Sequence, residues 1–556
     1  MSAAIREPHN LSGSDAIAEE AAGVNFFELD SSLRSLLPLY MPDELLAHMW
    51  PHFERLGALV GGRLDDLART ADRYPPVLHP RDRFGRDEEW IEHHPAYHEM
   101  EAIAYGDLGL QAMSHRGGVL GWSEPVPAIA KYMFQYLFVQ AEFGLMCPVS
   151  VSDTAAFLLK RYGDEALKAQ YLPGMLSQDM NTLLRGTQFM TEKAAGSDVG
   201  NIETEARPID GEWRLYGDKW FCSHADADVA MILARPAGAP TGTRGLGLFL
   251  LPRHRPDGTR NAYRIVRLKD KLGTRSMASG EIRLEGAMAY PVGDLQRGLK
   301  QMLDQVNLSR LSHGVRAASM MRRCLNEALA CARTRPAFGG FIEKLPLVQR
   351  ELLKMQTRTE HALSVCMFAA SVMGTDDVDS ELLLRILTPL VKYGACRDNV
   401  EVATAAMEMR GGNGYIEDWV NPRLIRDAQV GLLWEGTSNI NALDVVQRAI
   451  AKVGAQQPLI AALEERLNTA QVAPALRERA LCALQNANTF AAHVGQEARF
   501  EHRARDATRL MYDAVGAALM LAEDAELAAA GSAHRRAPFA QWLLTSSLES
   551  QDPYAL

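Results

Sequence analysis

The residue pattern of this chain changes twice along its length, and this change constrains the fold more than any other feature. Up to about residue 185, apolar residues recur at three- and four-residue spacing, which is typical of helices. Between residues 186 and 291 the pattern becomes alternation broken by glycine and proline, which favours short strands. Helical spacing returns from residue 295 to about 450. Since 556 residues are too many for one core, the order predicts helical, β and helical domains in succession.

The expected elements follow from these patterns. Residues 1 to about 35 have little periodicity and are expected to form an arm, and a fourth, alanine-rich helical segment is expected from about residue 454 to 556. The expected strands are residues 213–216, 219–223, 229–234, 247–251, 263–268 and 280–284, which suggest a small barrel or sandwich. The expected helices are residues 129–145, one capped by Ser152 and Asp153, 299–334, 346–373, 380–409, 440–453, 474–485, 491–506 and 508–530.

Charge and cysteine content argue against several classes of protein. The net charge is −10, which disfavours a general binder of nucleic acids or membrane surfaces. No apolar run approaches membrane-spanning length, and the first residues are polar and lack the apolar stretch of a signal peptide. The seven cysteines are scattered, with no metal-binding spacing to each other or to histidine. These features predict a cytoplasmic protein with reduced thiols and no metal site.

A single carboxylate, Glu435, stands in the run Gly-Leu-Leu-Trp-Glu-Gly-Thr-Ser-Asn-Ile of residues 431–440. Apolar residues precede Glu435, and small, hydrogen-bonding residues follow it. An apolar pocket raises the pKa of a carboxyl group and suits it to abstract a proton near neutral pH. Taken alone, the motif favours a surface carboxylate in a turn, but the surrounding chain makes Glu435 the candidate catalytic base.

Four further segments carry residues suited to a nucleotide cofactor. The small residues and hydroxyls of the loop 190–198 allow backbone amides to approach a planar polar ligand. Residues 219–223 form an aromatic strand that ends in a hydroxyl. Arg335, with Phe338 ahead of two glycines, suits a phosphate and a base. The glycines of 411–414 would place bare backbone against a pyrophosphate, although their spacing and helical context do not match a Rossmann fingerprint.

Together and in this order, the motifs resemble the acyl-CoA dehydrogenase family. The family succession is Thr-Glu-x-x-Ala-Gly-Ser-Asp, Lys-x-aromatic-x-Ser/Thr, Arg-x-x-Phe-Gly, Gly-Gly-x-Gly-Tyr/Phe, Arg-Asp-Ala and Glu-Gly-Thr. In this chain the motifs are residues 191–198, 219–223, 335–339, 411–415, 426–428 and 435–437. The resemblance covers roughly residues 90–450. Lys193 in place of the usual proline, the runs 219–223, 267–276 and 320–323, and the extra C-terminal segment resemble the AidB-like branch.

The resemblance implies an α+β fold in four parts. These are an N-terminal arm and helical domain (1–185), a middle β-barrel or sandwich domain (186–292), a C-terminal four-helix-bundle domain (293–453) that carries the catalytic Glu, and an extra helical domain (454–556). It also implies FAD as the cofactor, bound between the β-domain and the helical domain. The family is usually a homotetramer, a dimer of dimers, in which a neighbouring subunit contributes to each site.

Site residues carry over from the family motifs. Phe221 would pack on the isoalloxazine ring, Ser223 would hydrogen-bond near N5, and Arg335 and Phe338 of a neighbouring subunit would bind the pyrophosphate and adenine. The residues that the resemblance assigns to FAD are Met190, Thr191, Ser197, Phe221, Cys222, Ser223, Arg335, Phe338, Gly411, Gly412, Leu433, Trp434, Thr437 and Asn439.

The resemblance also implies a reaction. Glu435 would remove the α-proton of an acyl-CoA, of short or branched chain, while the β-hydrogen leaves as hydride to flavin N5. A flavin ribityl hydroxyl and the Glu435 amide would stabilise the developing enolate. An electron-transfer flavoprotein would accept the electrons. Arg310 is a candidate substrate contact, with a structural ion pair as the alternative.

Two other functions remain open at this point. One is an AidB-type flavoprotein of the DNA-alkylation response, with little dehydrogenase activity and DNA binding through the C-terminal segment. Residues 454–556 contain nine arginines and no lysine against twelve Asp and Glu, a net charge of −3, which disfavours direct DNA binding. The other is a flavin oxidase or monooxygenase that acts on a substrate without CoA, which Lys193 and its neighbourhood leave open.

Overall fold

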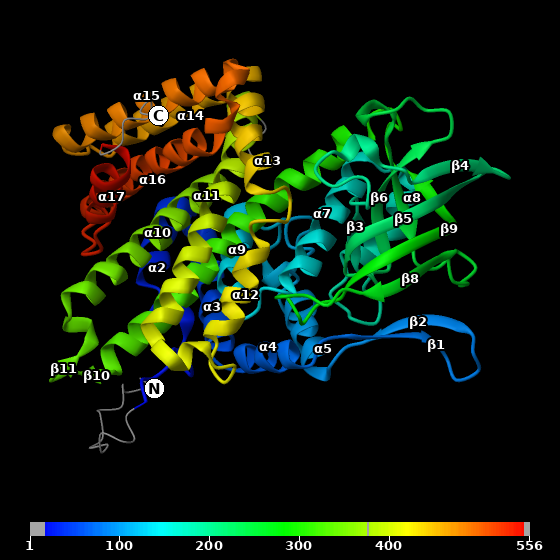
Figure 1. The fold of residues 1–556 in the computed structure, drawn as a ribbon, viewed down its shortest axis with the longest axis horizontal. Helices are drawn as coiled ribbons and strands as arrows, with labels where there is room; N and C mark the ends of the chain where they lie inside the picture. Colours follow the sequence, from blue (N-terminus) through cyan, green and yellow to red (C-terminus); the bar gives the residue numbers. More distant parts are fainter. Residues whose placement is uncertain (1–16, 375–376, 550–556) are drawn as a thin grey trace. The chain divides into compact units, whose positions relative to one another are not determined.

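The computed structural model describes residues 17–374 and 377–549, and it combines helices with a β-domain formed by the middle part of the chain (Figure 1). The chain forms two compact units. The first contains the described residues of Met1–Asp65, Ala128–Ala141 and Arg310–Leu556, and the second contains Asp66–Pro127 and Glu142–Ser309. The predicted α+β class, with helical, β and helical parts in succession and extra C-terminal helices, is confirmed. The four domain boundaries stay a prediction.

The β-domain of the second unit is a closed barrel. In sequence order its strands are β3 (Gly186–Phe189), β4 (Glu205–Ile209), β5 (Glu212–Ser223), β6 (Val229–Pro236), β7 (Gly247–Pro252), β8 (Tyr263–Leu268) and β9 (Ser279–Pro291). Neighbouring strands pair in the order β6, β4, β5, β9, β7, and β7 returns to β6. The ring therefore leaves no free edge between these five strands, while β3 adds to β6 and β8 adds to β9.

Strand β6 shows why these residues form a barrel wall. Its residues are apolar at every position from Val229 to Ala234, which is typical of a strand buried on both faces. Because side chains alternate across a strand, Ala230 and Ile232 enter the core of the barrel. Val229 and Met231 point outward and pack with helices α7 (Met146–Tyr162) and α8 (Glu165–Met175). Alternate residues of β6 therefore belong to two hydrophobic cores, one inside the barrel and one between the barrel and the helices α7 and α8.

The observed strands differ from the expected ones in three ways. Residues 213–216 and 219–223 belong to one strand, β5, because irregular pairing with β9 absorbs the interruption at Gly217. Strands β3 and β4 were not expected, since β3 has only four residues and β4 is mostly exposed and contains a proline. A hairpin of β1 (Val77–Arg81) and β2 (Asp87–Glu92) interrupts the region expected to be helical.

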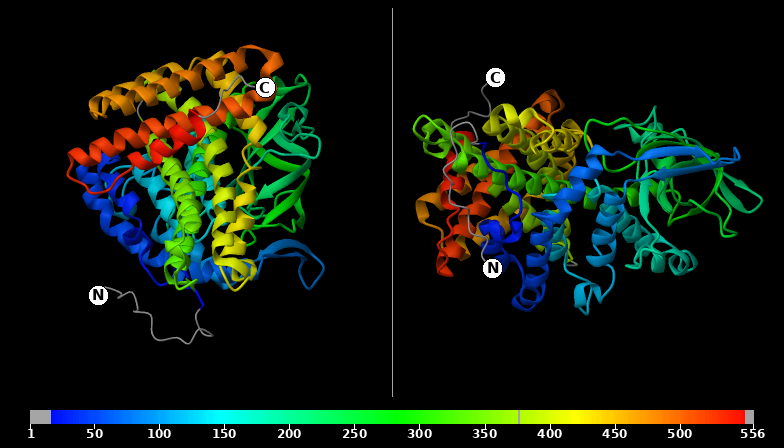
Figure 2. Two further views of the ribbon diagram at one scale, coloured as in Figure 1. Left: turned by 60° about the vertical axis from the view of Figure 1, so that its left-hand side comes forward. Right: turned by 90° about the horizontal axis from the view of Figure 1, so that it is seen from below.

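The first unit contains the long helices α10 (Pro346–Ser371), α11 (Val378–Arg410) and α16 (Ala504–Ala529). Its other main helices are α2 (Ser31–Tyr40), α3 (Asp43–Val60), α6 (Ala128–Val139), α12 (Asn421–Val430), α13 (Ser438–Leu443), α14 (Gln456–Thr469), α15 (Pro474–Gln496) and α17 (Ala537–Leu543). Helix α9 (Gly298–Thr334) passes from one unit to the other at residue 310. Helix α10 packs against α6, α11, α16 and α17. Figures 1 and 2 show the long helices of this unit.

Several helical expectations are corrected. The arm expected up to residue 35 already contains α1 (Phe26–Leu29) and the start of α2; its first 16 residues lie outside the described chain. Ser152 and Asp153 do not cap a helix but lie within α7, where the Ser152 hydroxyl bonds the backbone of Gly186. The helix expected at 491–506 is divided, because α15 ends at Gln496. The helix expected at 440–453 widens into a π-helix from Asp444.

The extra C-terminal helices are tied to the rest of the first unit by buried charges. The Arg536 side chain is fully buried and pairs with Glu360 of α10 at 2.6 Å and with Glu523 of α16 at 2.8 Å. Glu360 also pairs with Arg322 of α9 at 2.6 Å. Such a network is costly to break, because each loss leaves a charge without compensation away from water. Among the described residues, no helix has the length and apolar content needed to cross a membrane.

Candidate functional site

In the second unit, a buried ion pair fixes the predicted cofactor loop to strand β5. The Nζ of Lys219 lies 2.5 Å from the Glu192 carboxylate and also donates to the carbonyl of Leu233 at 2.8 Å. Glu192 also accepts from the Thr204 hydroxyl at 2.5 Å and from the Glu203 amide at 2.6 Å. Burial lowers the pKa of Lys219, and Glu192 opposes that shift. The Thr-Glu and Lys-x-aromatic motifs are therefore two sides of one structural joint.

Next to this joint the barrel presents an exposed aromatic surface. Phe221 is 58% exposed although it lies within a strand. The Lys269 ammonium lies 3.2 Å from the centre of the Trp220 ring, and the Trp220 amide donates to the Thr191 carbonyl at 2.9 Å. Open space lies where a side chain at Gly196 would be. An exposed ring flanked by a hydroxyl-rich loop suits a flat, polar aromatic ligand such as an isoalloxazine.

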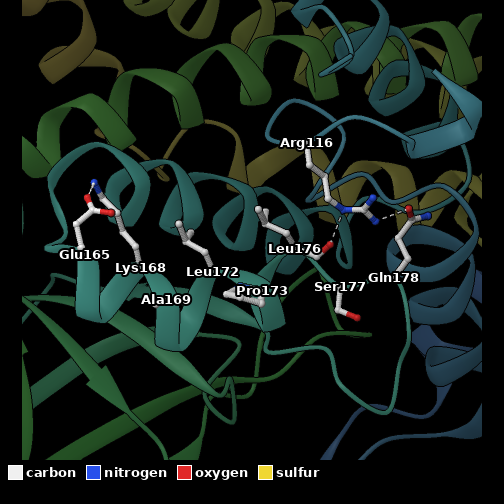
Figure 3. Close-up of a pocket in the computed structure, with 9 residues that line it drawn as sticks. All are labelled: Arg116, Glu165, Lys168, Ala169, Leu172, Pro173, Leu176, Ser177 and Gln178. Atoms are coloured by element: carbon white, nitrogen blue, oxygen red, sulfur yellow. Dashed lines mark hydrogen bonds and ion pairs between the residues drawn. The ribbon is translucent and has the colours of Figure 1, made fainter. Parts of the chain in front are cut away.

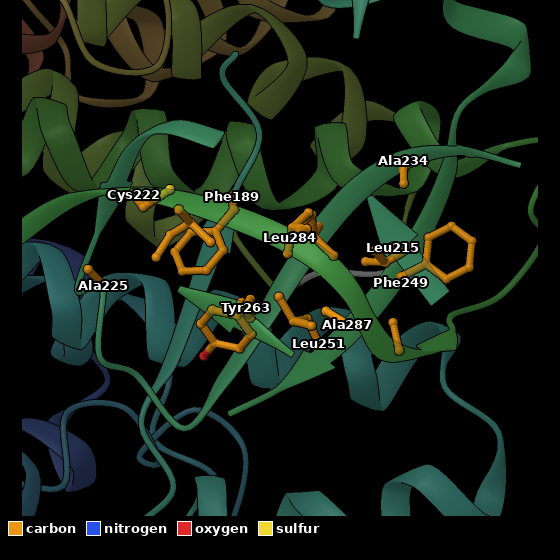
Figure 4. Close-up of a cluster of buried hydrophobic side chains, with 14 of the residues drawn as sticks. Phe189, Leu215, Cys222, Ala225, Ala234, Phe249, Leu251, Tyr263, Leu284 and Ala287 are labelled. Atoms are coloured by element: carbon orange, nitrogen blue, oxygen red, sulfur yellow. The ribbon is translucent and has the colours of Figure 1, made fainter. Parts of the chain in front are cut away.

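Cys222 points the other way. Its side chain has no exposed surface and packs in the barrel core with Phe189 and Ala225 (Figure 4). Burial raises the pKa of the Cys222 thiol, so the group stays neutral. The alternation of β5 explains this, because Phe221 and Ser223 share one face and Cys222 the other. Any contact of Cys222 with a cofactor therefore rests on its main chain.

In the first unit the structure brings Arg335 and Gly411 together. Arg335 follows α9 and donates from Nη1 to the carbonyl of Arg410 at 3.3 Å. A Cβ on Gly411 would lie 2.9 Å from the same guanidinium nitrogen, and Gly411 has a φ of +70°, so the position requires glycine. Phe338, at the tip of a two-residue hairpin, is 94% exposed with a φ of 51°. This cationic and aromatic edge suits a phosphate and a base.

Glu435 lies in the loop between α12 and α13 with a left-handed backbone. Its φ is 54°, which is uncommon for any residue other than glycine and marks a site where the surroundings impose the conformation. The side chain is half-buried. Leu433 is 62% exposed, whereas the Trp434 ring packs edge-on against His313 with 5.5 Å between centres. Thr437 and Asn439 are exposed at the start of α13.

Buried polar groups bind the carbonyls of this loop. Arg310 of α9 donates from Nε to the Glu435 carbonyl at 3.2 Å, and Lys392 of α11 donates to the Gly436 carbonyl at 2.6 Å. The Asn441 amide donates to the carbonyls of Gly436 and Thr437 at 2.8 and 3.0 Å. These donors lie on three different helices, so the loop conformation depends on the packing of the bundle.

Arg310 is fixed by an acidic partner. Its guanidinium pairs with the Asp444 carboxylate, which also pairs with Arg385 at 2.5 Å. Burial opposes the ionisation of Asp444, but the two arginines outweigh it and lower the pKa of that carboxyl. The structural ion pair considered for Arg310 is thus present. Its role as a substrate contact stays a prediction.

The predicted residues of the first unit form two separate groups. Lys392, which contacts the Glu435 loop, lies within α11, and Gly411, which contacts Arg335, directly follows the end of that helix. At about 1.5 Å per helical residue they are about 28 Å apart. Arg335, Phe338, Gly411 and Gly412 therefore do not share one pocket with Glu435 of the same unit.

A hollow in the second unit lies away from the predicted site residues. A groove of about 570 Å³ runs along α8 and is lined by Arg116, Lys168 and Leu172 among others (Figure 3). Arg116 donates to the carbonyl of Leu176 at 3.0 Å and to the side chain of Gln178 at 2.8 Å. None of the predicted site residues lines this groove.

Sequence reasoning missed the residues beneath the Glu435 loop. Lys392, Asn441 and Asp444 were not among the predicted site residues. Lys392 left a weak signal, because it is a lone charge beside the apolar Leu390 and Val391 within a helix. Asn441 and Asp444 left none, since short polar residues near the start of a helix are ordinary.

Comparison with known proteins decides the family. Acyl-CoA dehydrogenase family member 11 of Caenorhabditis elegans is 32% identical over 434 residues, which cover 75% of this chain and 69% of that protein. This chain belongs to the acyl-CoA dehydrogenase family. The putative acyl-CoA dehydrogenase AidB of Escherichia coli is 33% identical over 69% of this chain and 70% of its own length.

Family models and a solved structure agree with this acyl-CoA dehydrogenase assignment. Residues 17–182 match the adaptive response protein AidB N-terminal domain, 187–287 the acyl-CoA dehydrogenase middle domain, and 296–450 the acyl-CoA dehydrogenase C-terminal domain. The structure of C. elegans ACDH-11 in complex with C11-CoA superposes with a TM-score of 0.89 at 27% identity, over 99% of this chain and 95% of that one. The protein is an FAD-dependent, AidB-like oxidoreductase of this family.

Proposed function

We propose that this protein dehydrogenates an acyl-CoA, with Glu435 as the base that removes the α-proton. The conformation of Glu435 supports this role more than any other feature. Its backbone is left-handed, and its carbonyl and that of Gly436 are bound by the buried side chains of Arg310 and Lys392. Strain of this kind is common where a side chain must be aimed at a reacting atom. A fixed carboxylate suits proton abstraction, because the base must meet the substrate proton within hydrogen-bonding distance.

Other residues of the chain bind and orient. The hydroxyls of Thr191, Ser197 and Ser223 and the ring of Phe221 hold the cofactor through the surface built on Lys219 and Glu192. Arg335 and Phe338, with Gly411 and Gly412, bind the pyrophosphate and adenine ends in a neighbouring subunit. Leu433 and Trp434 exclude water from the base. When bound, the flavin supplies the hydride acceptor at N5.

The proposal also covers the class of substrate, the electron acceptor, the assembly and the location of the protein. A short or branched acyl-CoA is the first candidate, and the C11-CoA bound to ACDH-11 adds straight chains of that length. An electron-transfer flavoprotein is the proposed electron acceptor. We propose a homotetramer, since a cofactor site shared between subunits makes assembly part of binding. The proposed location is the cytoplasm.

An AidB-type role is the second candidate, supported by the match of residues 17–182 to the AidB N-terminal domain. Direct DNA binding has little support from the extra C-terminal helices. Most of the arginines there are already neutralised by acidic side chains, which leaves no clear basic face. The paired arginines are Arg466, Arg479, Arg499, Arg503, Arg509 and Arg536. A flavin oxidase or monooxygenase acting on a substrate without CoA is the third candidate.

An anaerobic spectral titration tests the dehydrogenase proposal. The purified FAD protein is mixed with short straight, branched and C11 acyl-CoAs, and the same panel is repeated on Glu435→Gln. Flavin absorbance should bleach with one class of acyl-CoA in the wild type. In Glu435→Gln the rate should fall by a factor of about 10² to 10⁴, because the amide cannot accept the proton. Bound flavin that responds to no acyl-CoA would refute the proposal.

Such an outcome would favour the other candidates, which differ in two further measurements. An oxidase should consume oxygen with a substrate that lacks CoA. An AidB-type DNA binder should retard duplex DNA in a gel-shift assay with an affinity that falls steeply from low to high salt.

A further inference from the structure

Lys392 is a buried cation that has no acidic partner among the described residues. It lies in the middle of α11, and only 1% of its surface is exposed. Its ammonium donates to the Gly436 carbonyl at 2.6 Å, and no described carboxylate forms an ion pair with it. A lysine in this position loses the hydration of its charge without gaining a salt bridge, and such groups persist mainly where they serve a function.

The loop that Lys392 contacts needs an external donor. A left-handed backbone is unfavourable for a residue such as Glu435, so hydrogen bonds to the carbonyls of the loop are needed to stabilise it. Arg310 is shared with Asp444, and the Asn441 amide belongs to the helix that follows the loop. Lys392 reaches the loop from α11, which makes it an independent support for the peptide that follows Glu435.

We propose that Lys392 is a positioning residue, whose buried ammonium binds the Gly436 carbonyl and thereby keeps Glu435 in its left-handed, working conformation. This inference rests on the proposed role of Glu435 as base. Lys392 acts through the backbone of the loop, and the proton of the substrate goes to Glu435 alone.

The surroundings of Lys392 make this support sensitive to pH. Burial lowers the pKa of Lys392 to about 8, while Cys396 on the same helix and Glu435 on the loop act against the shift and Arg310 on α9 adds to it. Burial raises the pKa of the Cys396 thiol, so Cys396 stays neutral in this range. Lys392 therefore loses its charge at mildly alkaline pH, and a neutral amine is a weaker donor to a carbonyl.

Kinetics of the FAD-loaded full chain test the proposal with the acyl-CoA that reduces the flavin. Lys392→Met should lower kcat by about 10- to 100-fold, the usual worth of a hydrogen bond from a charged group, with KM and FAD content little changed. In wild type kcat should fall above about pH 8, and this fall should be absent in Lys392→Met. Lys392→Arg, which keeps the charge, should recover part of kcat and move this fall to higher pH. Arg397→Met, five residues further along α11, removes a cation that does not touch the loop and should behave as wild type.

Hydrogen exchange gives a readout that does not depend on activity. Amides of residues 433–437 should exchange faster in Lys392→Met than in wild type, and amides of the loop 190–198 should not. In wild type alone, protection of 433–437 should fall between pH 7 and 9.5 after correction for intrinsic exchange. This measurement remains decisive if the methionine variant does not fold.

Two outcomes separate this inference from the proposed function. If Glu435→Gln abolishes reduction but Lys392→Met keeps the wild-type kcat, pH profile and loop protection, the positioning role is wrong and the base assignment stands. If Lys392→Met loosens the loop while Glu435→Gln still reduces the flavin, the loop support is correct but Glu435 is not the base, and the positioning role for catalysis fails with it.

Discussion

Two buried lysines in this protein have opposite surroundings. Lys219, in the barrel of the second unit, has a side chain with no exposed surface and lies 2.5 Å from Glu192. It also donates to the main-chain carbonyls of Leu233 and Met190. Lys392, in the helical first unit, is equally buried, but its ammonium donates to the Gly436 carbonyl and forms no ion pair with any described residue. The charge of Lys219 is compensated by a carboxylate in direct contact, whereas Lys392 forms no ion pair with any described residue and the Glu435 carboxylate offsets only part of the effect of burial.

This difference separates a structural joint from a functional support. Removal of Lys219 would leave the Glu192 carboxylate buried without its cation, which is among the costliest single changes in a protein. Removal of Lys392 would leave only a carbonyl without one donor, and it would also remove a buried charge that is itself unfavourable. The first lysine should therefore control stability and the second the conformation of one loop.

The largest expected effect follows from breaking the compensated pair. Lys219→Met should lower the free energy of unfolding by about 3 kcal/mol, because Glu192 remains buried and charged. Lys392→Met should change it by less than about 1 kcal/mol. Denaturant unfolding of the FAD-loaded proteins measures both, with Lys168→Met as a control, because Lys168 is partly exposed and its partner Glu165 stays in water.

A double variant sharpens this comparison. Lys219→Met combined with Glu192→Gln should lose less than the sum of the two single changes, since the second change removes the charge that the first left unpaired. Strict additivity would show that the two side chains do not act as a pair.

The next effect is a pH dependence of stability with a defined sign. Lys392 has a pKa of about 8 in the folded protein, below its ordinary value of 10.5. Between these values the unfolded chain binds a proton that the folded chain has released, so stability rises with pH. The difference in unfolding free energy between wild type and Lys392→Met should therefore grow in favour of wild type by on the order of 1 kcal/mol per pH unit above pH 8. Activity of the wild type should fall over the same range. If the stability difference fell together with the activity, the assignment of the lowered pKa to Lys392 would be wrong.

The smallest effect concerns the other partners of Glu192. Thr204→Val removes a hydroxyl that donates to Glu192 at 2.5 Å, but the ion pair and the backbone amides remain. The expected loss is about 1 kcal/mol in denaturant unfolding. Thr404→Val, on the exposed side of α11, removes a hydroxyl that bonds only its own helix and should change stability by less than about 0.5 kcal/mol.

Much of the fold followed from local pattern. Long amphipathic segments gave α9, α10 and α11 to within a few residues at nearly every end, because helical spacing is repeated many times within each. Short elements were missed, since the four residues of β3 and the exposed β4 contain too little alternation to be recognised. The hairpin β1–β2 was missed for a different reason, because it interrupts a region of helical pattern.

The candidate site divides in the same way. The motif residues, including Glu435, Arg335 and Phe221, were named from the order of motifs along the chain. The pairing of Arg335 with Gly411 and the burial of Cys222 against the exposure of Phe221 became visible only in the fold. The supports beneath Glu435 come from helices distant in sequence, so no local pattern could join them.

The sequence by itself determined the long helices and most of the barrel strands, which residues match the family motifs, and that a carboxylate follows an apolar run at position 435. Tertiary structure alone decided that Glu435 adopts a left-handed backbone and that the buried Lys392 donates to the carbonyl of the next residue without forming an ion pair with any described carboxylate. The physical reason is that local propensity depends on neighbours in the chain, whereas burial and the partner of a charge depend on neighbours in space.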